Sequence, residues 1–229
     1  MKKIDTSNAP VSIVGNHVKI TTHEGFAAGQ LFGLTFADKL GDGALRMKKS
    51  GEALYLSPVF ETEEPFNDLV ASWNTETPMG TWIEVFGRLY LPEYDGWADR
   101  DGNTYDGWTD WLSWGQWSTH IARNCPYGQD THPRKDSEEN DGWAYAYSFN
   151  GGGDSSLNTR GEFTASAFQL KVVFHAEADC QAMPSLRLLA ATWKNTNDPD
   201  WQSKCTYPEE PIEAAPSVLL DTPAISQMA

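Results

Sequence analysis

The sequence predicts an all-β protein, built as a two-sheet antiparallel sandwich or jelly roll. Short runs rich in β-branched and aromatic residues recur along the chain, and such residues favour strands. Clusters of Gly, Pro, Asn and Asp separate these runs, as turns require. Long segments with a helical period are scarce. Many short strands with turn signals between them are typical of sandwiches.

The expected strands follow one another from the N-terminal part of the chain to residue 193. The run at 81–91 mixes Trp82 and Val85 with Glu84 and Arg88, and its content of β-branched and aromatic residues favours a strand over a helix. The runs expected to form strands are VSIV (11–14), HVKITT (17–22), LVASW (69–73), TWIEVFGRLYL (81–91), WAYAYSF (143–149), FQLKVVFHA (168–176) and SLRLLAATW (185–193).

A change of composition near residue 195 indicates the end of the sandwich. Residues 195–217 are rich in Pro, Asp and Glu and have no periodic apolar face, which is typical of an extended linker. The chain then becomes apolar again at 218–229. We therefore expect a sandwich domain at 1–194, a linker at 195–217, and the first strand of an absent domain at 218–229.

The charge of the chain excludes some classes of partner. Lys and Arg number 17 against 32 Asp and Glu, which gives a net charge of −15. Such a surface repels nucleic acid and anionic lipid, and it suits divalent cations, basic peptides or neutral glycans. No apolar run approaches the ~20 residues of a membrane-spanning helix. Neither transmembrane segment nor nucleic-acid partner is expected.

The compartment is left open by the sequence. The first ten residues have a basic start but no apolar stretch behind it, so no signal peptide is expected. An extracellular or cell-surface location follows if a signal was removed, and a cytoplasmic one otherwise. The three cysteines, Cys125, Cys180 and Cys205, lack the CxxC spacing of a zinc site. A disulfide between Cys180 and Cys205 is one alternative.

The tetrapeptide YDGW occurs twice, at 94–97 and 105–108, and indicates a hairpin. Two registers are open. A turn centred on Gly102 and Asn103 pairs Trp97 with Trp108 and gathers four aspartates on one face, which requires a cation because opposed like charges are destabilising. A turn centred one residue earlier makes Trp97 face Asp106, and no cation is then needed.

The first register motivates a calcium hypothesis. Asp99, Asp101, Asn103 and Asp106 partly imitate the oxygen-rich loops that bind calcium. Their pattern departs from the EF-hand, because the glycine comes too early and no Glu lies at loop position twelve. The alternative is an acidic, solvated hairpin in which Asp serves the turn.

Four tryptophans recur every third residue, at Trp108, Trp111, Trp114 and Trp117. On a strand this spacing alternates the rings between the two faces. We expect Trp111 and Trp117 on one side and Trp108 and Trp114 on the other. Trp73 and Trp82 are expected in the core.

Outward rings are candidates for stacking on sugars or peptide side chains, because they offer large rigid apolar faces. The residues predicted to bind a ligand in this way are Tyr94, Trp97, Tyr105, Trp108 and Trp114.

Two catalytic arrangements are conceivable, but for the residues of both the sequence favours a structural role. His120 and His132 lie on either side of Cys125, and a thiolate nucleophile needs such a base. However, loop His and Cys residues of a sandwich are usually structural. Glycosidases use two carboxylates, but no spacing selects a pair from Glu84, Glu162 and Glu177.

Several segments carry a resemblance to a known family. They are LYLSPVFETEEPFNDLVASWNTETPMGTWIEV (54–85), WTDWLSWGQWS (108–118), ASAFQLKVVFH (165–175) and PSLRLLAATW (184–193). Together they resemble the N-terminal β-sandwich region of bacterial cysteine peptidases of the bacteriocin-processing-peptidase-like family. The terminal LLDTPAISQMA (219–229) resembles the start of the papain-like catalytic domain of those proteins.

The resemblance implies an accessory role. Gln227 matches the side-chain donor of the family's oxyanion hole, a group often worth ~3 kcal/mol in acyl transfer. The family's CGP-like catalytic cysteine and its histidine have no match in this chain, so the chain as given is not expected to cleave peptides. We expect it to bind or position a cell-wall glycan or a peptide substrate beside a C-terminal peptidase domain. The alternatives are a jelly-roll glycan hydrolase or lyase, and a structural spacer that packs on the peptidase domain.

Overall fold

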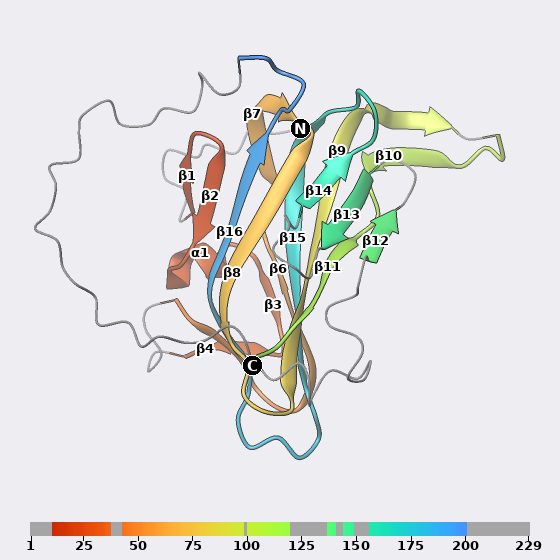
Figure 1. The fold of residues 1–229 in the computed structure, drawn as a ribbon. Coiled ribbons are helices and arrows are strands. Elements are labelled where there is room, and N and C mark those ends of the chain that lie inside the picture. The colour runs from red at the N-terminus through yellow and green to blue at the C-terminus, as the bar shows by residue number, and fades with distance from the viewer. Residues whose placement is uncertain are drawn as a thin grey trace, which may run out of the picture. The chain divides into compact units, whose positions relative to one another are not determined.

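The computed structural model describes residues 11–37, 43–98, 100–119, 137–140, 144–148 and 156–200. These residues form strands and one short helix, which confirms the prediction of an all-β protein (Figure 1). The elements are β1 (Ser12–Val14), β2 (His17–Ile20), α1 (His23–Ala27), β3 (Gln30–Phe32), β4 (Leu34–Phe36), β5 (Leu45–Met47), β6 (Gly51–Leu56), β7 (Phe60–Phe66), β8 (Asp68–Glu76), β9 (Thr81–Ala98), β10 (Thr104–Trp108), β11 (Leu112–Trp117), β12 (Ser137–Asn140), β13 (Ala144–Ser148), β14 (Ser156–Thr159), β15 (Ala165–Ala176) and β16 (Ser185–Lys194).

Two antiparallel sheets make up the fold, as the sequence predicts. The nine-stranded sheet has the order β1-β2-β16-β8-β14-β13-β12, and β5 joins it by pairing with β16 and β4. The seven-stranded sheet has the order β10-β9-β15-β6-β3, with β11 paired to β9 and β7 paired to β15. No helix among the described residues is long and apolar enough to cross a membrane.

Buried and half-buried residues alternate along the longest strands, and the buried ones form the core between the sheets. In β9 the odd-numbered residues from Thr81 to Leu91 are buried and the even-numbered ones are half-buried, which is the period of a strand with one face inward. Phe66, Phe168 and Trp193 form a cluster of rings with centroids 5.3–6.5 Å apart. Full burial of each such side chain contributes about 1.5–3 kcal/mol.

Trp114 lies inside this core, so the prediction that it points outward is wrong. It is 0 % exposed, and a Cβ placed on Gly87 of β9 would come within 2.6 Å of its ring. A register shift between Ser113 and Gln116 of β11 breaks the alternation, as a bulge does. The expected pairing of rings is therefore also wrong, because Trp117 faces the interior with Trp114 whereas Trp111 stays outside with Trp108.

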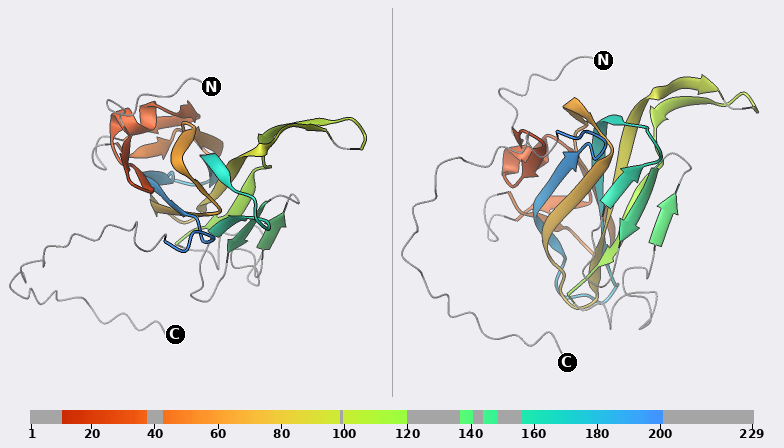
Figure 2. Two further views of the ribbon diagram at one scale, coloured as in Figure 1. Left: turned by 90° about the horizontal axis from the view of Figure 1, so that it is seen from above. Right: turned by 45° about the horizontal axis from the view of Figure 1, so that its top comes forward.

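The hairpin of β9 and β10 adopts neither predicted register. Thr104 pairs with Ala98, Asp106 with Asp95, and Trp108 with Tyr90, with a shift between each pair. The partner of β9 on its other side, β15, ends its pairing at Tyr90. Residues 92–98 and 100–107 therefore form a two-stranded arm that projects from the seven-stranded sheet (Figure 2).

The first compact unit of the chain ends at Asp198. Residues 201–229 lie outside the described part of the structure, and with them most of the predicted linker, the predicted strand at 218–229, and Gln227. Cys125, His120 and His132 also lie outside it, as does Cys205. Within the described residues Cys180 has no disulfide partner, and its thiol donates to the carbonyl oxygen of Gly80 at 3.0 Å. A disulfide to Cys205 stays a prediction from the sequence.

Candidate functional site

The outer face of the seven-stranded sheet carries an alternating series of rings and cations. We call it the aromatic ladder, and it consists of Phe86, Lys171, Trp111, Arg88 and Trp108. Lys171 Nζ lies 4.0 Å from the ring centre of Phe86 and 4.7 Å from that of Trp111. Arg88 Cζ lies 4.7 Å from the ring centre of Trp111 and 4.4 Å from that of Trp108. Each such cation–π contact is worth about 0.5–1 kcal/mol at an exposed site and more when desolvated.

The register between β9 and β15 produces the ladder. It sets Lys171 opposite Phe86 and Gln169 opposite Arg88, and directly opposed side chains are close enough to interact. The Oε1 atom of the buried Gln169 accepts bonds from Arg88 Nη2 at 2.7 Å and Nε at 3.1 Å. Burial lowers the pKa of Arg88, while the carboxylate of Asp106 acts in the opposite direction. The guanidinium is thus held in one orientation between two indoles.

At the end of the ladder nearest the arm, two aspartates face each other. Asp95 and Asp106 are paired in the register. The Tyr90 hydroxyl donates to Asp95 Oδ2 at 2.7 Å, and the main-chain N–H of Trp108 donates to Asp106 Oδ1 at 3.1 Å. The bond to Asp95 raises the pKa of Tyr90, with further effects from burial and from both carboxylates. Each aspartate therefore has a donor.

Trp82 continues the outer face at the opposite end of β9, and its expected place in the core is wrong. Its ring stacks on His175 with centroids 5.0 Å apart and an angle of 8° between the planes. His175 Nδ1 lies 3.8 Å from a carboxylate oxygen of Glu52. Burial lowers the pKa of His175, although Glu52 and Glu84 act in the opposite direction.

The arm gathers three of the predicted ligand-binding residues. Trp97 is 43 % exposed, and its ring centre lies 5.4 Å from that of Tyr105 and 6.3 Å from that of Tyr94. Tyr94 also contacts Phe163, the residue two before β15, at 5.0 Å between centroids. Trp108 belongs to the ladder instead, and the burial of Trp114 removes it from any exposed ring set.

Two residues of the calcium hypothesis, Asp101 and Asn103, are exposed between β9 and β10. Asp106 lies in β10 and accepts a bond from the main-chain N–H of Trp108, and Asp99 lies outside the described residues. Among the described residues, no group of three or more His, Cys, Asp or Glu side chains is placed to hold a metal ion. Calcium binding by this loop remains a prediction from the sequence.

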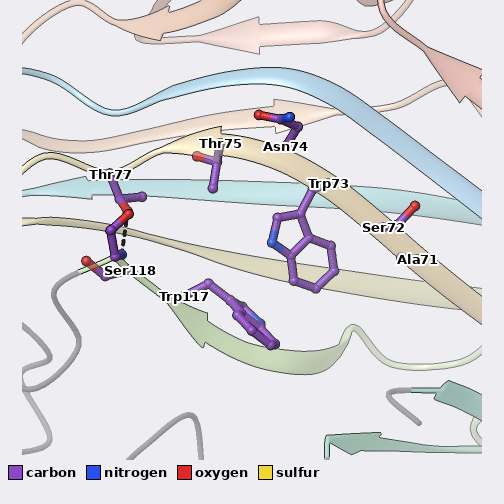
Figure 3. Close-up of a pocket in the computed structure, with 9 residues that line it drawn as sticks. Ala71, Ser72, Trp73, Asn74, Thr75, Thr77, Trp117 and Ser118 are labelled. Atoms are coloured by element: carbon purple, nitrogen blue, oxygen red, sulfur yellow. Dashed lines mark hydrogen bonds between the residues drawn. The ribbon is translucent and has the colours of Figure 1, made fainter. Parts of the chain in front are cut away.

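A groove with a volume of 540 Å³ opens beside β8, in the size range of ligand sites. Trp73 of β8 and Trp117 of β11 lie next to each other in it, with centroids 5.4 Å apart and an angle of 73° (Figure 3). The groove residues are Ala71, Ser72, Trp73, Asn74, Thr75, Thr77, Trp117, Ser118 and Thr119.

Hydroxyl contacts close one end of the groove. Thr77 Oγ1 accepts from the main-chain N–H of Thr119 at 2.8 Å and lies 3.0 Å from the Thr119 hydroxyl. The Ser118 hydroxyl donates to the carbonyl oxygen of Thr81 at 2.8 Å. The sequence predicts Trp73 in the core and does not reveal this groove. The signal that could have pointed to it is the polar composition of the strand around Trp73, with Ser72, Asn74 and Thr75.

The carboxylates weighed for glycan hydrolysis are not assembled as a set. Glu162 precedes β15 and Glu177 follows it, so about 40 Å of strand separates them at ~3.3 Å per residue. Paired catalytic carboxylates lie within about 10 Å of each other. Glu84 accepts a bond from the Ser113 hydroxyl at 2.6 Å.

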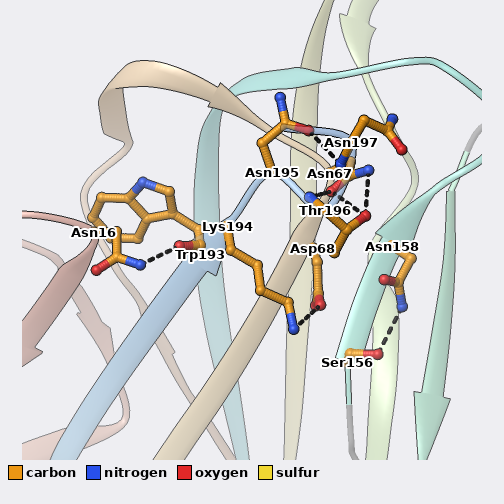
Figure 4. Close-up of polar contacts among 10 residues, drawn as sticks. All are labelled: Asn16, Asn67, Asp68, Ser156, Asn158, Trp193, Lys194, Asn195, Thr196 and Asn197. Atoms are coloured by element: carbon orange, nitrogen blue, oxygen red, sulfur yellow. Dashed lines mark hydrogen bonds and ion pairs between the residues drawn. The ribbon is translucent and has the colours of Figure 1, made fainter. Parts of the chain in front are cut away.

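Asn67 ties the end of β16 to the sandwich (Figure 4). Its main-chain N–H donates to the carbonyl oxygen of Lys194 at 3.1 Å. Its side-chain Oδ1 accepts from the N–H of Thr196 at 2.8 Å, and its Nδ2 donates to the Thr196 hydroxyl at 2.9 Å. An ion pair between Lys194 Nζ and Asp68 Oδ2 at 3.1 Å adds to this clamp.

The described residues define the class of the protein by its fold, an all-β sandwich of two antiparallel sheets. The family model of the Peptidase C39 N-terminal domain matches residues 16–193. The chain therefore belongs to this family, and it is an accessory domain associated with C39 peptidases, as its resemblance to peptidase N-terminal regions implied. No curated protein and no solved structure showed significant similarity to it.

Proposed function

We propose that this domain is a non-catalytic binding module that holds a neutral cell-wall glycan for a C39-type, papain-like peptidase domain. The observation that carries the proposal is the exposure of Trp97, which is 43 % exposed on the arm. Tyr105 beside it is half-buried, and Tyr94 packs against the margin of the core. The exposure of the Trp97 ring, with two tyrosine rings next to it, is better explained by contact with a ligand than by a role in the core.

The chemistry of the arm suits a sugar without negative charge. Indole and phenol rings offer flat apolar faces to the C–H side of a pyranose, and their polar edges bond to hydroxyls. Carboxylates accept hydrogen bonds from sugar hydroxyls, and Asp95, Asp101 and Asp106 lie on the same arm. The net charge of −15 disfavours anionic wall polymers.

A second candidate function is that of a spacer that packs on the peptidase domain. The outer face of the seven-stranded sheet favours it, because Phe32 is 52 % exposed there. Half-buried apolar residues, Leu54, Leu56 and Val173, lie on the same face in register with Phe32, Gln30 and Glu84. This candidate predicts that removal of Phe32 weakens contact with the peptidase domain and leaves glycan binding intact.

Co-sedimentation with insoluble peptidoglycan and affinity electrophoresis in neutral polysaccharides test the proposal. Trp97→Ala should weaken retention about tenfold or more, as truncation of an aromatic binding hot spot commonly does. Phe32→Ala is the matched control, since it removes a ring of similar exposure from another surface. Equal retention of the two variants, or no retention of the wild-type chain, would contradict glycan binding by the arm.

A further inference from the structure

We propose that the groove beside β8 binds an extended peptide, which adds to the sheet as an extra strand. This site is separate from the arm and goes beyond the glycan-binding proposal. The ligand is a segment of about five to seven residues with uncharged side chains at the positions that enter the groove.

In the part of the chain that the structure describes, strand β8 is fully paired on one side only. β8 pairs with β16 along its whole length, from Asp68 to Glu76. On its other side β14 pairs with it only at Asp68 and Leu69. Among the described residues, no strand pairs with this side of β8 from Val70 to Glu76. A row of main-chain N–H and C=O groups at such an edge is a template for another strand.

A division of the nine-stranded sheet leaves this edge unpaired within the described residues. The nine-stranded sheet divides where β14 leaves β8 at Leu69 and continues into β13 and β12. Strand β11 of the other sheet contacts β13 on the far side of this division. Trp117 of β11 reaches Trp73 of β8 across the opening (Figure 3). The groove therefore has a strand edge on one side and an aromatic wall beside it.

The residues that line the groove determine which peptide side chains can bind there. None of the described residues that line the groove is charged, so a charged side chain would be buried there without a partner. Trp73 and Trp117 provide apolar surface, and Ser72 provides a hydroxyl. The hydroxyls of Thr75 and Ser118 already donate to the carbonyl oxygens of Ser185 and Thr81, so toward a ligand they offer their oxygens as acceptors. The negative charge of the whole chain also opposes acidic peptides. Small, apolar or hydroxyl-bearing side chains fit this environment.

Dimensions and geometry favour a peptide over a glycan. The edge from Val70 to Glu76 covers seven residues, which correspond to about 23 Å at ~3.3 Å per residue. Alternate side chains of an added strand would point toward the two indoles and away from them, and this alternation gives specificity in strand addition. A sugar chain lacks the repeating N–H and C=O groups that match a strand edge.

The test uses the full 229-residue chain and a labelled neutral heptapeptide of alternating Thr and Val. Fluorescence anisotropy measures binding of this peptide and of a matched peptide N-methylated at every second residue. Binding of the first and at least tenfold weaker binding of the second is expected, because N-methylation removes donors but keeps the side chains. Equal binding of both peptides, or binding of neither, would overturn the proposal.

Hydrogen exchange locates the site without a substitution. Bound peptide should slow exchange of amides within 70–76, and protection confined to other segments would refute the site. Trp73→Ala should weaken peptide binding at least tenfold, whereas Trp97→Ala should leave it unchanged. A neutral oligosaccharide that protects 70–76 instead of the peptide would overturn the choice of ligand. Because glycan retention is measured with Trp97→Ala, failure of either proposal leaves the other standing.

Discussion

The aromatic ladder and the arm lie along two parts of one long strand, β9, and their rings have different surroundings. In the ladder, β15 lies alongside β9 and supplies Lys171 and the Gln169 that orients Arg88, so each ring packs against a cation. Beyond Tyr90, β9 pairs with β10 alone, and Trp97 remains 43 % exposed. A neighbouring strand, more than the residue type, therefore decides whether a tryptophan of this sheet packs against a cation or stays exposed.

The largest expected difference in stability is between a tryptophan of the interior and one of the arm. Trp114→Ala should lower the free energy of unfolding by about 3–5 kcal/mol, because it leaves a cavity between the sheets. Trp97→Ala should change it by no more than about 0.5 kcal/mol, as surface substitutions do. Urea denaturation followed by tryptophan fluorescence measures both. A loss below about 1 kcal/mol for Trp114→Ala would contradict its place in the core.

The two glycines of the repeated YDGW sequence allow the packing at the base of the arm to be compared with that at its middle. Gly96 and Gly107 have φ of 80° and 79°, so alanine at either costs about 1–2 kcal/mol in the backbone. A Cβ on Gly96 meets nothing within 4 Å, whereas a Cβ on Gly107 would lie 2.6 Å from the Tyr90 ring. Gly107→Ala should therefore destabilise by about 1–3 kcal/mol more than Gly96→Ala.

Thermal and urea unfolding of the two alanine variants measure that difference. Equal losses of stability would show that the base of the arm is no more tightly packed than its middle. A greater loss for Gly96→Ala would reverse the order that the structure implies.

Substitution of Arg88, whose guanidinium lies between two indoles, should reduce stability moderately. Arg88→Gln should cost about 1–2 kcal/mol, because two cation–π contacts are lost. Arg187→Gln is the control, since Arg187 is exposed and its ion pair with Glu76 is worth about 0–1 kcal/mol. Arg88→Lys should recover part of the loss. If Arg88→Gln and Arg187→Gln unfold at the same urea concentration, the ladder does not stabilise the sheet.

The smallest expected effect is a pH dependence of stability that comes from His175, at the end of β9 remote from the arm. The pKa of His175 is lowered from its ordinary value of 6.5 in the folded protein, so the unfolded chain binds the proton more readily. This contribution to stability is complete above pH 6.5 and is lost as the pH falls through the lower folded pKa. Wild-type protein should lose more stability between pH 7.5 and 5.5 than His175→Gln, as measured by urea unfolding. Parallel losses would contradict this.

The sequence predicts the body of the fold well, because alternation is a local property. The run at 81–91 contains buried Ile83, Val85 and Leu89 at every second position, and this pattern requires no knowledge of distant residues. The residues 94–108 also point to a hairpin from their turn signals alone, and the structure confirms the hairpin.

Irregular backbone and long-range pairing explain what the sequence could not predict. The shift between Ser113 and Gln116 reverses the faces of later residues, and no residue type marks its position uniquely. The shifts in the arm replace both expected registers in the same way. The groove depends on the separation of β14 from β8 and on Trp117 meeting Trp73, 44 residues apart in the chain, so only the folded arrangement contains it.

The bonds at Asn67 have a consequence for the path of the chain after β16. Because Thr196 is bonded to Asn67, the point and direction in which the chain leaves the sandwich are fixed two residues after the strand has ended. Asn67→Ala would remove these bonds and leave that direction variable, although no exposed face of the sandwich would change.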